Sequence, residues 1–468
     1  MGATGQADLG VHLQWCYRRA MTLWQRIFQG VTAFWVETII NLVAGILGAR
    51  LVFHYLPPAD YGRLALFLSF YATGTMFLGF GLGSVFTTEI ARARGTGKRG
   101  WARFLISRYL VLLLAAATLL LFLFAGIGGW RGEPLLWNIM GAYLWLTAPN
   151  RAAYVLLHGA TRYRRLASQS ITRNLSRLAL LATLPRWWPG ESLTGVALTY
   201  PLTELAAMMV SLALVRVIWP EMRGVSTVGY SYKDLLVIFQ RQGLYATLSI
   251  PVKKIGDQLP VWLLKALAGD VELGIYAAAQ RAYLLVFAFF RSLETTLFPL
   301  IAEQIEVDKE RLRVALRQTQ KYSFWLGVAS ALFGTLVAPR GIQVLAGEQY
   351  RPAISVFRLM LWLLVLYAFS QAHRPLFYAL RQQKWLFATY VLSTTTYAVM
   401  LFGGIAIGGV TGAVGVLLVH GVLFATLRWL IVRRLDASLW IAPGSVLRLD
   451  DFDKRLWRKV IHHIRQRL

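Results

Sequence analysis

The chain has 468 residues, of which 57% are hydrophobic and 15% are charged, and its formal net charge is +27. A typical soluble domain has about 25% charged residues, so this composition excludes an ordinary soluble protein. In a soluble protein such a charge would indicate nucleic-acid binding. Membrane topology and anionic lipid account for most of it here, and we expect no nucleic-acid partner. The single cysteine, Cys16, excludes a disulfide framework.

Apolar runs long enough to cross a membrane recur along the whole sequence. Crossing about 30 Å of hydrocarbon takes about 20 residues of helix, which predicts an all-α, polytopic membrane protein with about twelve transmembrane helices. Residues 1–30 hold Trp and Arg residues typical of a cytoplasmic, interfacial lead-in segment. The predicted spans are 31–52, 64–86, 105–127, 135–158, 171–189, 194–218, 243–267, 273–298, 322–345, 354–379, 385–408 and 411–432.

The spans fall into two sets of six, separated by a polar linker. We predict an N-lobe at 31–220, a cytoplasmic linker at 221–242, a C-lobe at 243–434 and a basic, amphipathic tail at 435–468. The tail carries apolar residues at helical spacing with Lys and Arg between them, so we expect a helix on the membrane surface.

The two halves echo each other. Residues 58–65 and 268–277 each place an acid and a glycine in a tight turn before a helix rich in small residues. Repeated halves are common transporter architecture, so this echo favours internal duplication.

Basic residues outside the spans fall mainly in alternate loops, and cytoplasmic loops are the ones that retain Lys and Arg. This distribution predicts that both termini are cytoplasmic. The first 23 residues are too polar for a cleavable signal, so we expect the first span to be a retained anchor.

Basic side chains also lie inside the spans, where each costs roughly 2.5–3.5 kcal/mol at the centre of a helix. An anionic ligand is the simplest common cause. The alternative is snorkelling or local ion pairing, which suits Arg358 and Arg428 near helix ends. The intramembrane basic residues are Arg151, Arg173, Arg177, Lys253, Lys254, Arg281, Arg291, Arg358, Arg374 and Arg428.

Arg173 and Arg177 are four residues apart, so they share one helix face with Gln169. The arginine fork binds phosphate in a bidentate manner, so we interpret this pair as a phosphate clamp. The alternative is a short fifth span that leaves Arg173 near the cytoplasmic surface.

In the seventh span, Pro251 and Pro260 bracket three charged residues, which predicts a kinked or broken helix. Lys253 and Asp257 are four apart and could neutralise each other. Lys254 would then face another direction as a candidate ligand.

Three further basic residues are candidates. Arg291 can pair with Glu294, three residues away, whereas no carboxylate lies three or four residues from Arg281 in the sequence. Arg374 precedes Pro375, and Arg151 follows Pro149 by two residues, at similar depth in the two halves. The candidates for an anionic head group are Arg151, Arg173, Arg177, Lys254, Arg281 and Arg374. The candidates for coupling to H⁺ or Na⁺ are Asp257, Glu294, Glu37 and His373, and Glu89 and Glu204 are further carboxylates considered for this role.

Several segments resemble the bacterial lipid-linked oligosaccharide flippases: Ala49-Arg50-Leu51, Gly79-Phe80-Gly81-Leu82-Gly83, the run 273–281, and Phe298-Pro299. The resemblance extends from about residue 34 to 434. It implies the fold of the multidrug, oligosaccharidyl-lipid and polysaccharide exporters, with two six-helix lobes forming a V around a central cavity. Twelve spans suit the oligosaccharide branch better than the lipid II flippase branch, which carries two more helices.

The resemblance implies transport of an undecaprenyl-diphosphate-linked oligosaccharide from the cytoplasmic to the external leaflet of the bacterial inner membrane. Glycosyltransferases and a polymerase of the same pathway are implied partners. We expect no catalytic residues, no metal and no cofactor, with H⁺ or Na⁺ coupling open. The alternatives are a cation-coupled drug exporter of the same fold, a polytopic polymerase or ligase, and a non-transporting subunit of a polysaccharide synthase complex. The short external loops argue against the polymerase.

Overall fold

A computed structural model of the protein describes most of the helical part of the chain. The predicted lead-in segment 1–30, nearly all of the linker 221–242 and the tail beyond residue 446 lie outside the described residues. The described residues are 37–79, 82–95, 98–160, 162–218, 231, 244–304, 308–380 and 382–446.

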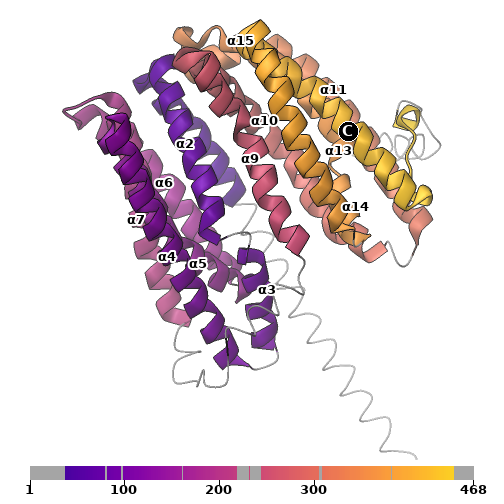
Figure 1. Ribbon diagram of the computed structural model, residues 1–468, viewed down its shortest axis with the longest axis horizontal. Coiled ribbons are helices and arrows are strands. Elements are labelled where there is room, and N and C mark those ends of the chain that lie inside the picture. Colours follow the sequence, from indigo (N-terminus) through magenta and orange to yellow (C-terminus); the bar gives the residue numbers. More distant parts are fainter. Residues whose placement is uncertain are drawn as a thin grey trace, which may run out of the picture. The chain divides into compact units, whose positions relative to one another are not determined.

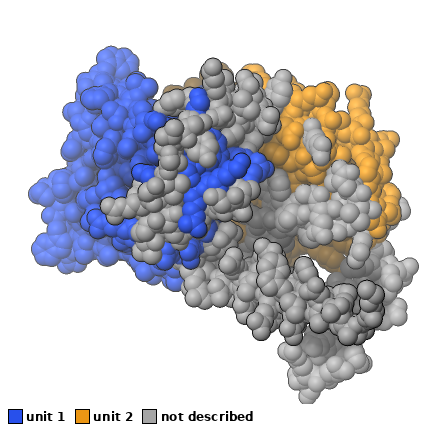
Figure 2. Space-filling view, turned by 90° about the horizontal axis from the view of Figure 1, so that it is seen from below, with its two compact units in different colours: residues 1–265, 269–274, 344–349 blue, residues 266–268, 275–343, 350–468 orange. Residues whose placement is uncertain are grey.

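The described chain is all-α and forms two compact units (Figure 1, Figure 2). Unit 1 includes the described residues of Met1–Lys265, together with Gly269–Gly274 and Val344–Gln349, and unit 2 includes most of the remainder. The predicted lobe boundaries stay a prediction.

In unit 1, a helix over residues 37–55 is followed by helices joined by short turns. The labelled helices are α2 (Pro58–Gly79), α3 (Leu82–Gly95), α4 (Arg99–Arg131), α5 (Pro134–Gly159), α6 (Tyr163–Trp187), α7 (Ser192–Ile218) and α9 (Leu244–Leu267). The α4 helix packs along α5, α5 along α7, and α6 along α7 (Figure 1).

Unit 2 has three long helices, α10, α11 and α15, and a region between α11 and α15 that is broken into short helices. The helices of this unit are α10 (Gly269–Gln304), α11 (Lys309–Ala346), α12 (Ala353–Leu361), α13 (Leu363–Ser370), α14 (His373–Ala379) and α15 (Gln383–Leu435). Three short 3₁₀ helices, η2 (Glu348–Tyr350), η3 (Ala437–Leu439) and η4 (Pro443–Val446), follow α11 and α15. The α10 helix leaves unit 1 after Gly274 and continues in unit 2.

Every predicted span overlaps a described helix. Within the described ranges, seven helices are long and apolar enough to cross a membrane, which confirms a polytopic membrane fold. They cover Glu37–Tyr55, Arg99–Trp130, Ser192–Arg216, Gly269–Ala288, Leu312–Ala346, Ala353–Ala379 and Gln383–Leu435. The α6 helix is not among them, because polar and basic residues interrupt its apolar pattern.

The predicted eleventh and twelfth spans form α15, a run of 53 residues that turns back at two glycines. Gly408 and Gly409 have non-helical dihedral angles, and Gly409 takes φ 53°, in the left-handed region that favours glycine. A Cβ at Gly412 would overlap the carbonyl oxygen of Gly404, so the two arms touch backbone to backbone.

The two turns of similar sequence lie against each other within unit 1. A Cβ at Gly62 would overlap the carbonyl oxygen of Asp270, and a Cβ at Gly274 would overlap that of Pro58. Each glycine therefore packs on the residue four positions before the other glycine. This reciprocal contact gives the sequence echo a structural role, because neither position tolerates a side chain without separating α2 from α10.

Candidate functional site

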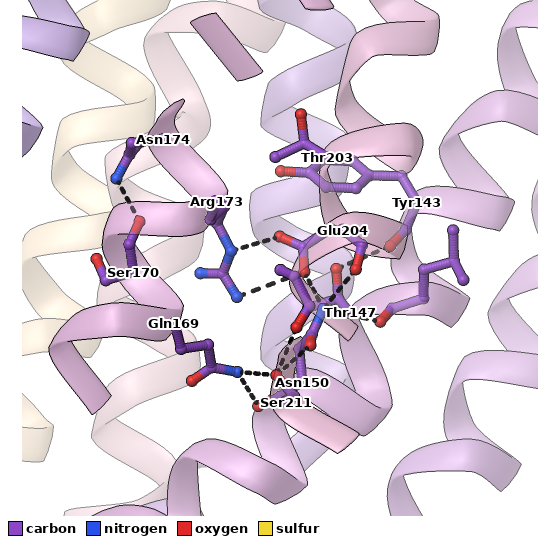
Figure 3. Close-up of polar contacts among 12 residues, drawn as sticks. Tyr143, Thr147, Asn150, Gln169, Ser170, Arg173, Asn174, Thr203, Glu204 and Ser211 are labelled. Atoms are coloured by element: carbon purple, nitrogen blue, oxygen red, sulfur yellow. Dashed lines mark hydrogen bonds and ion pairs between the residues drawn. The ribbon is translucent and has the colours of Figure 1, made fainter. Parts of the chain in front are cut away.

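A buried polar network joins α5, α6 and α7 inside unit 1 (Figure 3). At its centre, Asn150 is completely buried on α5, directly after Pro149. The Asn150 amide donates to the Glu204 carboxylate on α7 at 2.6 Å, and also to the Glu204 backbone carbonyl at 2.9 Å. A buried carboxylate requires such donors, because desolvation is costly. Asn150 thus fixes the position of the charge.

Arg173 on α6 forms an ion pair with this carboxylate (Figure 3). Its Nε lies 3.0 Å from Oε1 of Glu204, and its Nη2 lies 3.4 Å from Oε2. The Glu204 side chain is 3% exposed, whereas that of Arg173 is 38% exposed. Arg173 is near the middle of the 25-residue α6. The pair is therefore asymmetric, with an enclosed anion and a reachable cation.

Two more polar residues complete the connection between the three helices (Figure 3). Gln169 on α6 donates to the Ser211 hydroxyl on α7 at 2.6 Å, and that hydroxyl donates to Oδ1 of Asn150 at 2.9 Å. Gln169 and Ser211 are both buried. Satisfied networks of this kind hold helices in one relative rotation.

Arg177, one turn after Arg173, contacts an aromatic side chain. Its Nη2 donates to the Tyr200 hydroxyl at 2.6 Å, and its Cζ lies 4.2 Å from the Tyr200 ring centroid. Its Nε is buried, with no hydrogen-bonding partner among the described residues. Tyr143 and Tyr71, whose rings stack at 3.7 Å, continue this aromatic surface. Arg177 therefore retains a donor that a ligand could use.

Arg151, the neighbour of Asn150, is directed to another part of the unit. Its Nη1 donates to the carbonyl oxygen of Thr75 on α2 at 2.6 Å. This hydrogen bond anchors the side chain without neutralising its charge. The three N-terminal candidate arginines thus have three different kinds of partner: a carboxylate, a hydroxyl and a carbonyl.

Glu37 lies beside Arg173 in a small pocket of about 100 Å³, which Gln169 and Ser170 also line. Its Oε2 is buried and has no hydrogen-bonding partner in the described part of the chain. Asn41 donates to Oε1 of Glu37 at 3.4 Å and to Ser170 at 3.1 Å. A polar pocket of this size has room for water. The structure therefore brings Glu37 and Arg173, predicted separately, into one pocket.

The charged residues of α9 include a local pair. Lys253 Nζ lies 2.8 Å from Oδ2 of Asp257, and both side chains are about half exposed. Of the two possibilities that the sequence left open for Lys253, the structure shows the local ion pair. Lys254 is exposed on the same helix.

The remaining candidates belong to unit 2. Arg281 is partly exposed on α10 and Arg374 is exposed on α14. His373 is 1% exposed and packs edge-on against Trp429, with 4.8 Å between ring centroids. Glu294 lies on α10 at a position whose side chain is outside the described part. Convergence of the basic residues of both units on one cavity stays a prediction.

Sequence reasoning missed two members of the network, Tyr200 and Ser211, although it named Glu204. The signal was present in α7, because positions 200, 204, 207 and 211 follow the helical period and share one face. Three of those four residues are polar, in a helix that is otherwise strongly apolar. A polar stripe in a membrane helix is a sign of a buried site.

Solved structures similar in fold are membrane transporters. An inward-facing multidrug resistance MATE family transporter of the MOP superfamily aligns with TM-score 0.72 and 18% identity, covering 86% of this chain and 95% of that one. An outward-facing transporter of the same description aligns with TM-score 0.60 and 19% identity, covering 87% and 93%. A MATE structure in the bent conformation aligns with TM-score 0.62 and 16% identity, covering 86% of this chain and 94% of that one. At these identities the likeness defines the fold alone.

The family follows from the sequence. Residues 27–304, more than half of the chain, match the family model described as "Polysaccharide biosynthesis protein". The chain belongs to this family. No curated protein matches the sequence.

Proposed function

We propose that the protein is a flippase, which moves an undecaprenyl-diphosphate-linked oligosaccharide from the cytoplasmic to the external leaflet by alternating access. Three observations support this proposal: membership of a polysaccharide biosynthesis family, a transporter-type fold, and basic side chains within the helices of the spanning region. The bacterial inner membrane, with both termini in the cytoplasm, is the proposed location.

The environment of Arg177 is the observation that carries the proposal. Its guanidinium is held by a neutral tyrosine hydroxyl, and its buried Nε has no hydrogen-bonding partner among the described residues. A charged donor that is kept in an apolar helix bundle without a carboxylate is suited to an anionic ligand. A diphosphate supplies several acceptor oxygens. Arg173, whose side chain is 38% exposed, lies one helical turn away on the same face.

The remaining assignments extend this head-group site. Arg151, Lys254, Arg281 and Arg374 are proposed to contact the diphosphate during transport, while the polyprenyl tail stays in lipid. Anionic lipid contacts the basic loops, and glycosyltransferases and a polymerase act before and after transport.

Coupling to H⁺ or Na⁺ is assigned to acidic and imidazole groups. Glu37 is the best supported of them, because its buried Oε2 faces a polar pocket shared with Arg173. Asp257, Glu294 and His373 are further candidates, and Asp257 is already paired with Lys253.

A binding experiment tests the head-group site. The full chain in lipid nanodiscs is titrated with undecaprenyl diphosphate and, separately, with undecaprenol. Loss of a hydrogen bond to a charged group costs about 1.5–3 kcal/mol, so Arg177→Ala is expected to weaken diphosphate binding about tenfold or more. Arg177→Lys retains the charge but loses the planar guanidinium, so its affinity for the diphosphate is expected to lie between those of the wild type and Arg177→Ala. Arg358→Ala is the matched control, because this exposed arginine donates to the Thr335 carbonyl on a neighbouring helix.

Two results would refute the proposal. The first is equal affinity of the wild type for undecaprenyl diphosphate and undecaprenol. The second is equal diphosphate binding by the wild type and Arg177→Ala. Efflux of a cationic dye from vesicles, without diphosphate binding, would instead support the drug-exporter alternative of the same fold.

A further inference from the structure

Unit 1 contains a second cavity, which is lined by neither Arg173 nor Glu204. It has a volume of about 350 Å³, within the lower range of small-molecule sites. It is lined by residues 63–70 of α2, the start of α5 and the end of α9, and all of its lining residues belong to unit 1. The residues that matter most for its chemistry are Arg63, Phe70, Glu133, Leu136, Trp137 and Lys265.

The rim of this cavity is charged but internally compensated. Arg63 Nη2 lies 2.9 Å from Oε1 of Glu133, and Arg63 Nη1 lies 3.7 Å from Asp60. Lys265 Nζ lies 2.5 Å from Oδ1 of Asp270. Each cation therefore already has a carboxylate. A free anion would have to displace one, so this rim does not have the character of a second phosphate site.

The wall beneath the rim is aromatic. The Phe70 ring lies 5.2 Å from the Trp137 ring and 6.2 Å from the Trp262 ring, the latter nearly parallel at 27°. Trp262 is fixed by a 2.9 Å hydrogen bond from its Nε1 to the Ser69 hydroxyl on α2. Phe70 and Trp137 thus line the cavity in contact with each other, and Trp262, which is not a lining residue, packs against Phe70.

A lining that combines aromatic rings with paired donors and acceptors is complementary to a neutral sugar. A pyranose presents an apolar C–H face to a ring and hydroxyl groups at its edge. The hydroxyls can both donate to Glu133 and accept from Arg63 without a change in net charge. A purely apolar occupant fits poorly, because it would bury the Arg63–Glu133 pair away from water.

We propose that this aromatic pocket binds a neutral hexose-type unit of the transported oligosaccharide. The proposal rests on the flippase function and names a sugar subsite for it. None of the head-group arginines lines this pocket, although the ring of its lining residue Phe67 lies 6.1 Å from the ring of Tyr200, the partner of Arg177. The turns that bear Arg63, Glu133 and Lys265 are those whose sequence predicts the external side. The pocket would therefore receive sugar as it reaches that side.

The test uses a pocket-filling variant and a neighbour on the same helix. Leu136→Trp adds volume at a half-buried lining position, whereas Leu135→Trp adds the same side chain at a neighbouring position that is 55% exposed and does not line the pocket. Phe70→Leu keeps the pocket open but removes a ring face. Each full-length variant in nanodiscs is titrated by saturation-transfer NMR with neutral methyl glycosides, including hexosides, N-acetylhexosaminides and 6-deoxyhexosides.

The wild type is expected to bind at least one of these glycosides. Leu136→Trp is expected to weaken that binding about tenfold, equal to the loss of about 1.4 kcal/mol. Phe70→Leu is expected to weaken it severalfold, and Leu135→Trp to leave it unchanged. Thermal stability of the variants excludes misfolding as the cause.

The proposal is overturned if no neutral glycoside binds, if Leu136→Trp and Phe70→Leu both bind like the wild type, or if a methyl uronide binds more tightly than every neutral glycoside. Titration with sugar-free undecaprenyl diphosphate separates the two proposals. Glycoside binding without diphosphate binding would refute the flippase function but leave the sugar pocket standing. Diphosphate binding with no glycoside binding would refute only the pocket.

Discussion

The Arg173–Glu204 pair predicts unequal effects of removing its two members. Arg173→Ala leaves the Glu204 carboxylate 3% exposed with Asn150 as its remaining side-chain donor. Glu204→Gln leaves a guanidinium that is already 38% exposed and borders a polar pocket. Water can solvate the arginine much more readily than the carboxylate. The arginine variant should therefore be the less stable one.

The magnitudes follow from the burial of each group. Removing one member of a buried ion pair costs about 3–5 kcal/mol when it leaves the other charge buried and unpaired. Glu204→Gln keeps an acceptor for Asn150 and should cost about 1–2 kcal/mol, the loss of one charge-assisted contact. The double variant Arg173→Ala/Glu204→Gln removes the stranded charge. It should be more stable than Arg173→Ala alone, with a coupling energy of about 2 kcal/mol.

The assay is the free energy of unfolding of the four proteins, measured in detergent micelles with a denaturant or by steric trapping. A control is Arg358→Ala, which changes a basic residue with no carboxylate contact closer than 4 Å among the described residues. The reasoning fails if Arg173→Ala is no less stable than Glu204→Gln. It also fails if the effects of the two single substitutions add in the double variant.

Four other substitutions test local features of the fold. Gly62→Ala puts a methyl group into the α2–α10 backbone contact and should lower the free energy of unfolding by about 1–3 kcal/mol. Its control is Gly126→Ala on α4, where the new methyl group meets open space. That substitution should raise the free energy of unfolding by about 0.5–1 kcal/mol. Partial burial raises the pKa of Asp436, but hydrogen bonds from Lys309, at 2.8 Å, and from a nearby serine outweigh it and lower that pKa. A lowered folded-state pKa means that the pair stabilises the protein above the unfolded pKa of about 3.9 and loses this contribution as the pH falls through the folded value. Asp436→Asn should therefore flatten the dependence of melting temperature on pH below about 4. His373→Phe keeps the ring shape at a position where neither imidazole nitrogen has a hydrogen-bonding partner among the described residues. The free energy of unfolding should therefore change by less than about 1 kcal/mol, and a larger loss would reveal a polar role for the imidazole.

Helix positions followed closely from hydrophobic runs. The predicted span 135–158 is α5, Pro134–Gly159, and 194–218 is α7, Ser192–Ile218. The second span was placed less well, since it was predicted as 64–86. The α2 helix begins at Pro58 and ends at Gly79, and α3 begins at Leu82. Proline at the first helical position is a start signal that an apolarity count does not register.

The candidate site could be predicted only in part, because contacts within one helix follow from residue spacing and contacts between helices do not. The Lys253–Asp257 pair could be predicted because both residues are on one helix at i and i+4. The Arg173–Glu204 pair could not, because its members are 31 residues apart on different helices. Their contact depends on the relative rotation of α6 and α7, which tertiary packing determines. Sequence identified the charged residues of this network but not how they pair.

The different partners of Arg173 and Arg177 predict separate roles in binding a diphosphate. At Arg173 a diphosphate would compete with Glu204, because two anions on one guanidinium repel each other strongly at low dielectric. Substrate at Arg173 and a proton on Glu204 should therefore favour each other by the same factor. At Arg177 the competitor is a neutral hydroxyl, so no such linkage arises. We expect undecaprenyl diphosphate to bind wild-type protein more tightly as the pH falls within the range where the protein stays folded. Arg177→Ala should lower affinity at every pH and keep this slope, while Arg173→Ala should flatten it. Titrations across pH in nanodiscs measure both quantities, and an unchanged slope in Arg173→Ala would show that Glu204 does not act through this arginine.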